Sequence, residues 1–268
     1  MDKMTWVYPK SAGELESCLA DGARPVGGAT GLLRNAPKTG TFADLSGAGL
    51  GEVTIKDGAA TLGAMVTYAG TVQAISPVNG ENIVAKALST VAAPALRNVI
   101  TLGGSLGLFP PWSRLVGPLV ALDATLNTIG QRAGTYPVAE YVNSVELKEK
   151  SAVADVSFDV GEKWETSWFP FAPVRFNYPL LTVAVLVKSS GDTIDDCRIV
   201  ITGNRGRFAR LDAVEESVRG ASRSDVSVEA SDLGTDIVGR QGFSGDYLTH
   251  LTATYVTRGL RGSQRSAI

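Results

Sequence analysis

The stretch Val26-Gly27-Gly28-Ala29-Thr30-Gly31-Leu32-Leu33 decides how this sequence is interpreted. Glycine lets the backbone approach a ligand closely, so that successive N–H groups can converge on phosphate oxygens. A second segment, Thr101-Leu102-Gly103-Gly104-Ser105, has the same character, and its hydroxyl groups add further donors. Taken singly, each segment is also compatible with an ordinary turn, and neither is a G-x-G-x-x-G or Walker motif. A dinucleotide diphosphate is the natural ligand for donors of this kind.

Short strands and helices are predicted on both sides of these segments. Ser11 followed by Glu14 predicts a capped helix that ends near Ala20. Helical spacing predicts one helix over residues 83–96. The further predicted elements are strands at 24–26, 53–55, 60–62 and 127–129, a hairpin of 180–188 with 197–202, and helices over 211–218 and 247–260.

Composition and charge exclude several classes of protein. The 268 residues carry 25 Lys+Arg against 27 Asp+Glu, a balance that argues against a nucleic-acid binder. No uncharged apolar run reaches the roughly 18 residues of a membrane span, and the N-terminus lacks a signal-peptide pattern, so we expect a cytoplasmic protein without a membrane partner. Cys18 and Cys197 lie far apart and His250 is the only histidine, so we expect no metal site or iron-sulfur cluster built from this chain alone.

Several motifs, in this order and spacing, resemble one known family. Residues 26–33 resemble its Leu-Ala-Gly-Gly-Thr-Asp-Leu-Leu loop, and residues 62–67 (Leu-Gly-Ala-Met-Val-Thr) its Ile-Gly-Ala-x-Val-Thr element. Residues 97–105 resemble Arg-Asn-x-Ala-Thr-Ile-Gly-Gly-Asn, and residues 243–247 also fit. The family is the FAD-binding medium subunit of molybdenum hydroxylases, which includes carbon monoxide dehydrogenase flavoproteins and the flavin domain of xanthine dehydrogenase.

The resemblance implies an α+β fold, a two-subdomain FAD-binding fold of the PCMH/CO dehydrogenase flavoprotein type with a small C-terminal domain of antiparallel strands and helices. The expected ranges are 1–55 for an N-terminal α/β subdomain, 56–175 for a second subdomain with an antiparallel sheet, and 176–268 for the C-terminal domain. It also implies an electron-transfer oxidoreductase subunit. FAD would receive electrons from an iron-sulfur subunit, and a molybdopterin subunit would oxidise the substrate.

The resemblance also implies where the cofactor binds, but it assigns no catalytic residue. A substitution of Gly103 by Asp is expected to abolish FAD retention while leaving the fold mostly intact. The implied cofactor-binding residues are Val26, Gly27, Gly28, Ala29, Thr30, Gly31, Leu32, Thr101, Gly103, Gly104, Ser105, Ser113 and Arg114.

The sequence departs from the family pattern at three places; the departure at residue 29 is tolerable, whereas those at Arg114 and Phe171 motivate a second hypothesis. Ala29 stands at a glycine position, Arg114 follows Ser113 where an aspartate is usual, and Phe171 replaces a lysine ahead of Arg175. FAD would then be weakly bound or lost. The alternative is a homologue with a degenerate flavin site, used as a structural binding module or as a stand-alone, flavin-independent enzyme, for example a biosynthetic one, on an apolar substrate. Its pocket would be lined by Trp112, Arg114, Trp168 and Phe171.

Overall fold

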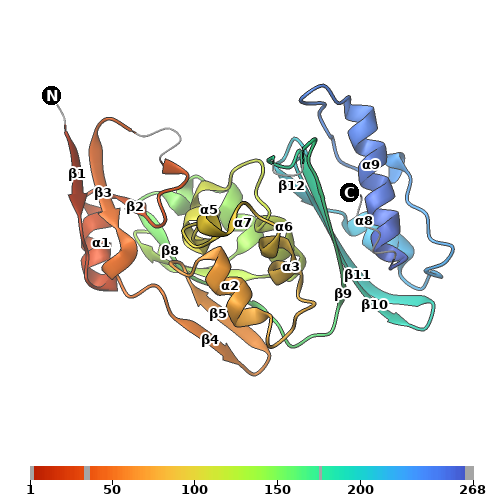
Figure 1. Cartoon of the computed structure of the whole chain (residues 1–268), viewed down its shortest axis with the longest axis horizontal. Helices are drawn as coiled ribbons and strands as arrows, with labels where there is room; N and C mark the ends of the chain where they lie inside the picture. Colours follow the sequence, from red (N-terminus) through yellow and green to blue (C-terminus); the bar gives the residue numbers. More distant parts are fainter. Residues whose placement is uncertain (1–2, 33–36, 175–176, 263–268) are drawn as a thin grey trace. The chain divides into compact units, whose positions relative to one another are not determined.

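The structure of the chain is a computed structural model that describes residues 3–32, 37–174 and 177–262 (Figure 1). Within these ranges, no helix is both long enough and apolar enough to cross a membrane. The elements in chain order are β1 (Met4–Val7), α1 (Ala12–Ala20), β2 (Arg24–Val26), β3 (Gly40–Asp44), η2 (Leu45–Gly47), β4 (Val53–Lys56), β5 (Ala59–Gly63), α2 (Tyr68–Ile75), α3 (Ile83–Ser89), α4 (Pro94–Arg97), α5 (Leu102–Leu108), α6 (Val116–Ala121), β6 (Thr125–Gly130), β7 (Gly134–Pro137), α7 (Val138–Asn143), η3 (Glu146–Lys148), β8 (Ser151–Asp159), β9 (Glu165–Phe171), β10 (Leu181–Ser190), β11 (Thr193–Thr202), β12 (Phe208–Arg210), α8 (Asp212–Val218), η4 (Ala230–Leu233) and α9 (Gly245–Leu260).

The chain forms two compact units that interleave along the sequence. The first comprises Met1–Asn79, Leu88–Pro110 and Leu122–Gly161, and the second comprises Gly80–Ala87, Pro111–Ala121 and Glu162–Ile268. The ranges expected from the sequence, 1–55, 56–175 and 176–268, are continuous, and these boundaries stay a prediction.

The first unit contains a parallel and an antiparallel sheet. The parallel sheet has the order β1-β3-β2, and the antiparallel sheet has the order β4-β5-β8-β6-β7. Helix α1 packs against β3, β6 and β8 through Leu15 and Leu19, both fully buried. The predicted cap of this helix is confirmed, because the Glu14 N–H donates to the Ser11 hydroxyl at 3.2 Å.

The single helix predicted over residues 83–96 is wrong, because the chain forms α3 and α4 with a break between them. Pro94 has no N–H group and starts α4, and Ala92 in the break has a φ of 47°. Arg97 holds the break in place, since its Nη1 donates to the carbonyls of Val91 and Ala92, both at 2.8 Å. The apolar spacing predicted one continuous helix and took no account of Pro94, which interrupts it.

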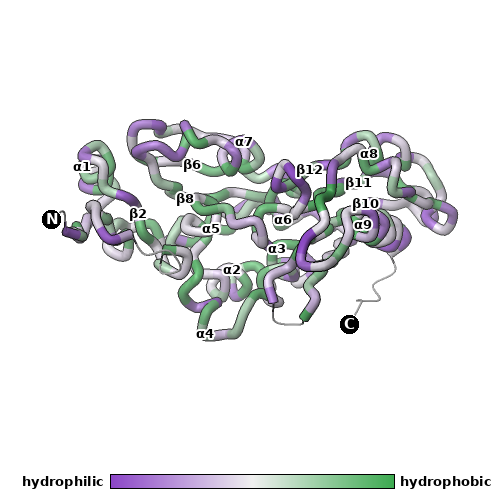
Figure 2. Tube along the Cα trace, turned by 90° about the horizontal axis from the view of Figure 1, so that it is seen from above, coloured by the Kyte–Doolittle hydropathy of each residue, from purple (hydrophilic) through white to green (hydrophobic). Residues whose placement is uncertain are grey.

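The second unit is a four-stranded sheet, β12-β11-β10-β9, with helices on both faces. The predicted hairpin is confirmed as β10 and β11, with Thr182 opposite Thr202. A Cβ on Gly117 of α6 would lie 3.2 Å from Thr202, whereas a Cβ on Gly259 of α9 would lie 2.7 Å from Val185. Thr182 and Val185 both lie in β10 and point to opposite faces of the sheet, so α6 and α9 cover different faces. Figure 2 shows the hydropathy along β10 and β11. The predicted α+β class is confirmed.

Candidate functional site

The first glycine segment, residues 27–30, follows β2 and carries backbone donors that the chain does not use. Within the described part of the chain, the N–H groups of Gly27, Ala29 and Thr30 have no hydrogen-bond partner. Ala29 has a φ of 57°, a left-handed conformation that turns the backbone at the centre of the segment. Successive N–H groups around such a turn form a concave site for an anion. The segment is half-buried, so these donors remain accessible to a ligand.

The structure brings the two glycine segments into direct contact within the first unit. A Cβ on Gly28 would lie 1.7 Å from the carbonyl oxygen of Val99, a separation that no side chain can adopt. A Cβ on Gly27 would lie 2.6 Å from the hydroxyl oxygen of Thr101. Gly31 is similarly close to Leu108, whose Cδ2 would lie 2.4 Å from an added Cβ. Glycine at positions 27 and 28 is therefore required by the packing of the chain on itself, in addition to any ligand, whereas the exposed Leu108 side chain beside Gly31 can move aside.

The second segment differs from the first because its N–H groups are already used. All four of the first N–H groups of α5 are bonded within the chain, so they are not available to a phosphate. The bonds are Leu102 N to Val66 O (3.0 Å), Gly103 N to Ala64 O (2.8 Å), Gly104 N to Thr101 Oγ1 (3.3 Å) and Ser105 N to Thr101 O (3.1 Å).

A buried tyrosine anchors the second segment. The Ser105 hydroxyl donates to the Thr101 carbonyl at 2.8 Å and is also hydrogen-bonded to the Tyr68 phenol. Burial raises the pKa of Tyr68 to about 12, against a smaller lowering by Ser105, so the phenol stays neutral. Sequence analysis did not identify Tyr68, although it directly follows the residues 62–67 that carry part of the resemblance.

The space around Gly103 is smaller than the sequence-based prediction assumed. A Cβ at this position would lie 2.6 Å from the Ala64 Cβ and 3.1 Å from the Ala64 carbonyl oxygen. Any side chain at Gly103 must therefore displace Ala64, the residue directly after β5. The expectation that Gly103→Asp leaves the fold mostly intact is wrong, and this variant cannot separate cofactor loss from misfolding.

Ser113 and Arg114 belong to the second unit, whereas both glycine segments belong to the first. Ser113 is buried, and its hydroxyl accepts hydrogen bonds from the N–H groups of Leu115 and Val116 at 3.3 and 3.4 Å, where α6 begins. Loss of water around Arg114 lowers the pKa of its guanidinium, which still carries its positive charge at neutral pH. A partly desolvated guanidinium is a strong donor to an anion.

Of the four residues expected to line an apolar pocket, Trp112 and Phe171 make ring contacts with other aromatic side chains of the second unit. Trp112 packs on Tyr178 with ring centroids 4.7 Å apart, whereas Phe171 meets Phe243 edge to face at 5.2 Å. The Nε1 of Trp168 is buried and has no partner among the described residues. Leu33 and Arg175 lie outside the described residues.

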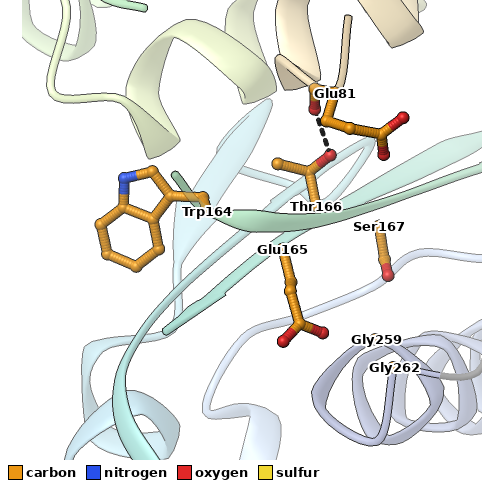
Figure 3. A pocket seen from close by; sticks show the side chains of 7 residues that line it. All are labelled: Glu81, Trp164, Glu165, Thr166, Ser167, Gly259 and Gly262. Carbon is orange, nitrogen blue, oxygen red and sulfur yellow. Dashed lines mark hydrogen bonds between the residues drawn. The ribbon is translucent and has the colours of Figure 1, made fainter. Parts of the chain in front are cut away.

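A cavity of about 140 Å³ lies elsewhere in the second unit, beside β9 (Figure 3). Thr166 points toward Glu81 and donates to its carbonyl at 2.6 Å, whereas Glu165 and Ser167 point toward the end of α9. The Glu165 carboxylate is held by Arg223 at 2.8 Å, and this hydrogen bond lowers the pKa of Glu165. None of the site residues expected from the sequence lines this cavity. Its lining residues are Glu81, Trp164, Glu165, Thr166, Ser167, Gly259 and Gly262.

Comparison with known proteins identifies the family to which these features correspond. A family model described as the FAD binding domain in molybdopterin dehydrogenase matches residues 2–158, more than half of the chain. The unpaired N–H groups of the first segment fit such a ligand, because the diphosphate of FAD offers anionic acceptors. The family expected from the motifs, and FAD as its cofactor, are therefore confirmed.

Individual relatives agree with this match. The chain is 27% identical over 185 residues to the nicotine 6-hydroxylase medium subunit of Paenarthrobacter nicotinovorans, an alignment that spans 63% of this chain and 61% of that protein. Its fold is similar to chains in quinoline 2-oxidoreductase from Pseudomonas putida 86, with a TM-score of 0.82, 20% identity and coverage of 96% and 98% of the two chains. Carbon monoxide dehydrogenase from Hydrogenophaga pseudoflava gives a TM-score of 0.86 at 18% identity, with 97% of each chain covered. The expected flavoprotein-type fold is thereby confirmed.

Proposed function

Because the chain belongs to the family of FAD-binding domains in molybdopterin dehydrogenases, we propose that it is the medium subunit of a multi-subunit molybdenum hydroxylase-type oxidoreductase. In this role the chain holds FAD between an iron-sulfur subunit and a final electron acceptor. FAD supplies the redox chemistry when it is bound. The residues of this chain bind and orient the cofactor, and substrate oxidation takes place in a separate molybdopterin subunit.

The observation that carries the proposal is the set of N–H groups at Gly27, Ala29 and Thr30 that have no partner among the described residues. Backbone donors without a partner in a half-buried segment are costly unless water or a ligand accepts from them. A diphosphate supplies several anionic oxygens to one concave group of donors. The proposed role of residues 27–30 is therefore to hold the diphosphate, and that of Val26, Gly31 and Leu32 is to shape the segment around it.

The second segment is proposed to support the first. Its Gly103 N–H donates to Ala64 and its Gly104 N–H donates to the Thr101 side chain of the same segment, so both glycines act by fixing the backbone of this segment. Arg114 and Ser113 stay in the proposed binding set as groups of the second unit. The charge of Arg114 suits the cofactor's phosphates, whereas the hydroxyl of Ser113 is already bonded to the start of α6.

The protonation of Cys197 and the placement of acidic, cysteine and histidine side chains suit a subunit that binds no metal cluster of its own. Burial raises the pKa of Cys197 to about 12, so that its thiol remains protonated and is a poor metal ligand. Within the described residues, no group of three or more His, Cys, Asp or Glu side chains is placed to hold a metal ion. The proposed iron-sulfur clusters would therefore be bound by a partner chain, in line with the name of the nicotine 6-hydroxylase relative as a medium subunit.

The test of this proposal is to purify a tagged form of the chain from its own organism and to measure flavin, iron and molybdenum in the same fraction. We expect all three to co-elute in a fixed ratio through size-exclusion chromatography. A chain that elutes alone with FAD would refute the multi-subunit role. A chain that elutes alone without any flavin would favour the degenerate-site alternative.

A further inference from the structure

We infer that Thr101 is a positioning residue that holds the first glycine segment in its ligand-binding conformation through its side-chain hydroxyl. The inference rests on the proposed function, because the group that the segment receives is the diphosphate of FAD. In this role Thr101 acts mainly by positioning the first glycine segment, in addition to any direct contact with the cofactor.

Thr101 is the residue at which the two glycine segments are joined. Its Oγ1 accepts a hydrogen bond from Gly104 N at 3.3 Å, which caps α5, and one from Gly28 N at 3.5 Å, which belongs to the first segment. Gly28 lies between the residues whose N–H groups are unpaired, Gly27 and Ala29. The second bond therefore turns the Gly28 donor into the protein, while its neighbours keep theirs available.

The position of the hydroxyl is fixed from several directions. Thr101 is only 4% exposed, and its carbonyl accepts from both the N–H and the hydroxyl of Ser105. Ser105 is in turn bonded to the buried Tyr68. The hydroxyl that contacts Gly28 is thus attached to a rigid part of the first unit, so the segment cannot shift without breaking this arrangement.

The hydroxyl proton of Thr101 gives the same residue a second use. A threonine hydroxyl has two acceptor positions and one donor hydrogen. Both acceptor positions are taken by N–H groups, and no described residue accepts the donor hydrogen. The hydrogen is therefore free to point to a phosphate oxygen held by residues 27–30, next to the unpaired N–H groups.

Thr67 provides a matched control for this role. It is also a threonine that caps a helix of the first unit, since its Oγ1 accepts from Gly70 N at 3.1 Å at the start of α2. Its hydroxyl has no described bond to the first glycine segment. Replacing either threonine by valine removes one helix cap, but only the Thr101 change also removes the bond to Gly28.

The experiment compares Thr101→Val, Thr101→Ser and Thr67→Val in the full chain. FAD affinity is measured by titrating the purified protein while following flavin fluorescence, and stability is measured without FAD by guanidinium unfolding. We expect Thr101→Val to weaken FAD binding about tenfold or more, because two hydrogen bonds and one donor are lost. Thr101→Ser retains the hydroxyl and should bind within about threefold of the wild type, as should Thr67→Val.

The outcomes separate this inference from the proposed function. Wild-type protein that retains no FAD would refute the proposed function itself. Wild-type protein that binds FAD as tightly as Thr101→Val would overturn only the role of Thr101. Equal losses of affinity in Thr101→Val and Thr67→Val would also overturn it, because the effect would then follow from the loss of a helix cap.

Discussion

Two glycines of the same helix should respond in opposite directions to the same substitution. Gly103 and Gly107 both lie in α5, and each is replaced by alanine. An added Cβ at Gly107 meets no atom within 4 Å, whereas one at Gly103 would lie 2.6 Å from the Ala64 Cβ. The pair therefore tests whether the second glycine segment is packed against β5 as tightly as the structure indicates.

The expected magnitudes follow from the surroundings of each glycine. Alanine at Gly107 gains helix propensity with no steric conflict, which stabilises the protein by about 0.5–1 kcal/mol. Alanine at Gly103 gains no more than that, but overpacking costs about 1–3 kcal/mol. The shift also strains the hydrogen bond from Gly103 N to Ala64 O, now 2.8 Å long, which contributes about 1 kcal/mol. We expect Gly103→Ala to be less stable than Gly107→Ala by about 2–4 kcal/mol.

The assay is guanidinium unfolding of the two variants and the wild type in the absence of FAD, followed by far-UV circular dichroism. Gly107→Ala should move the transition midpoint to higher denaturant concentration, and Gly103→Ala should move it to lower concentration. Stabilisation by both variants would refute the reasoning, because it would mean that the space beside Ala64 admits a methyl group.

Three further predictions concern single residues. Ala29→Gly should raise the free energy of unfolding, measured with denaturant, by up to about 1 kcal/mol. Glycine relieves the backbone strain at a φ of 57°, and the greater entropy of glycine in the unfolded chain offsets only part of that gain. The hydrogen bond from Arg223 lowers the pKa of Glu165 below its ordinary value of 4.5. The carboxylate therefore stabilises the fold above pH 4.5, and this stabilisation is lost as the pH falls through the lower pKa of the folded state. Glu165→Gln should therefore make stability less dependent on pH in the acid range, and an unchanged slope would contradict the ion pair. A maleimide reagent at pH 8 should modify the half-buried Cys18 before the buried Cys197, whose thiol has a pKa of about 12, as read by peptide mass spectrometry. Equal labelling of both thiols in the folded protein would contradict the burial of Cys197.

Local sequence patterns were sufficient for most of the elements. Ser11 and Glu14 identified the start of α1, and the β-branched residues on both sides of Gly191 identified the hairpin of β10 and β11. These features depend on neighbours that are close in sequence, so their physical cause is visible there. The predicted helix over 83–96 failed because apolar spacing was given more weight than Pro94.

The different hydrogen bonding of the two glycine segments could not be predicted from local sequence patterns. Both segments contain paired glycines and a threonine, yet among the described residues the N–H groups of the second segment have partners and those of Gly27, Ala29 and Thr30 have none. The difference arises because Val66 and Ala64, which lie more than thirty positions away in the sequence, accept from the N–H groups of Leu102 and Gly103. Thr101 accepts from the other two N–H groups of the second segment. Similarly, the contact between Gly28 and Val99 joins parts of the chain that no local pattern relates.

The central claim is that residues 27–30 hold the diphosphate of FAD, and a comparison of FAD with FMN tests it most directly. FMN carries the same isoalloxazine ring but lacks the diphosphate. Purified protein is incubated with each flavin and desalted, and its visible absorption is then recorded. We expect oxidised flavin bands, at about one flavin per chain, to remain after incubation with FAD and to disappear after incubation with FMN. Equal retention of the two flavins, or a colourless protein in both cases, would contradict the account.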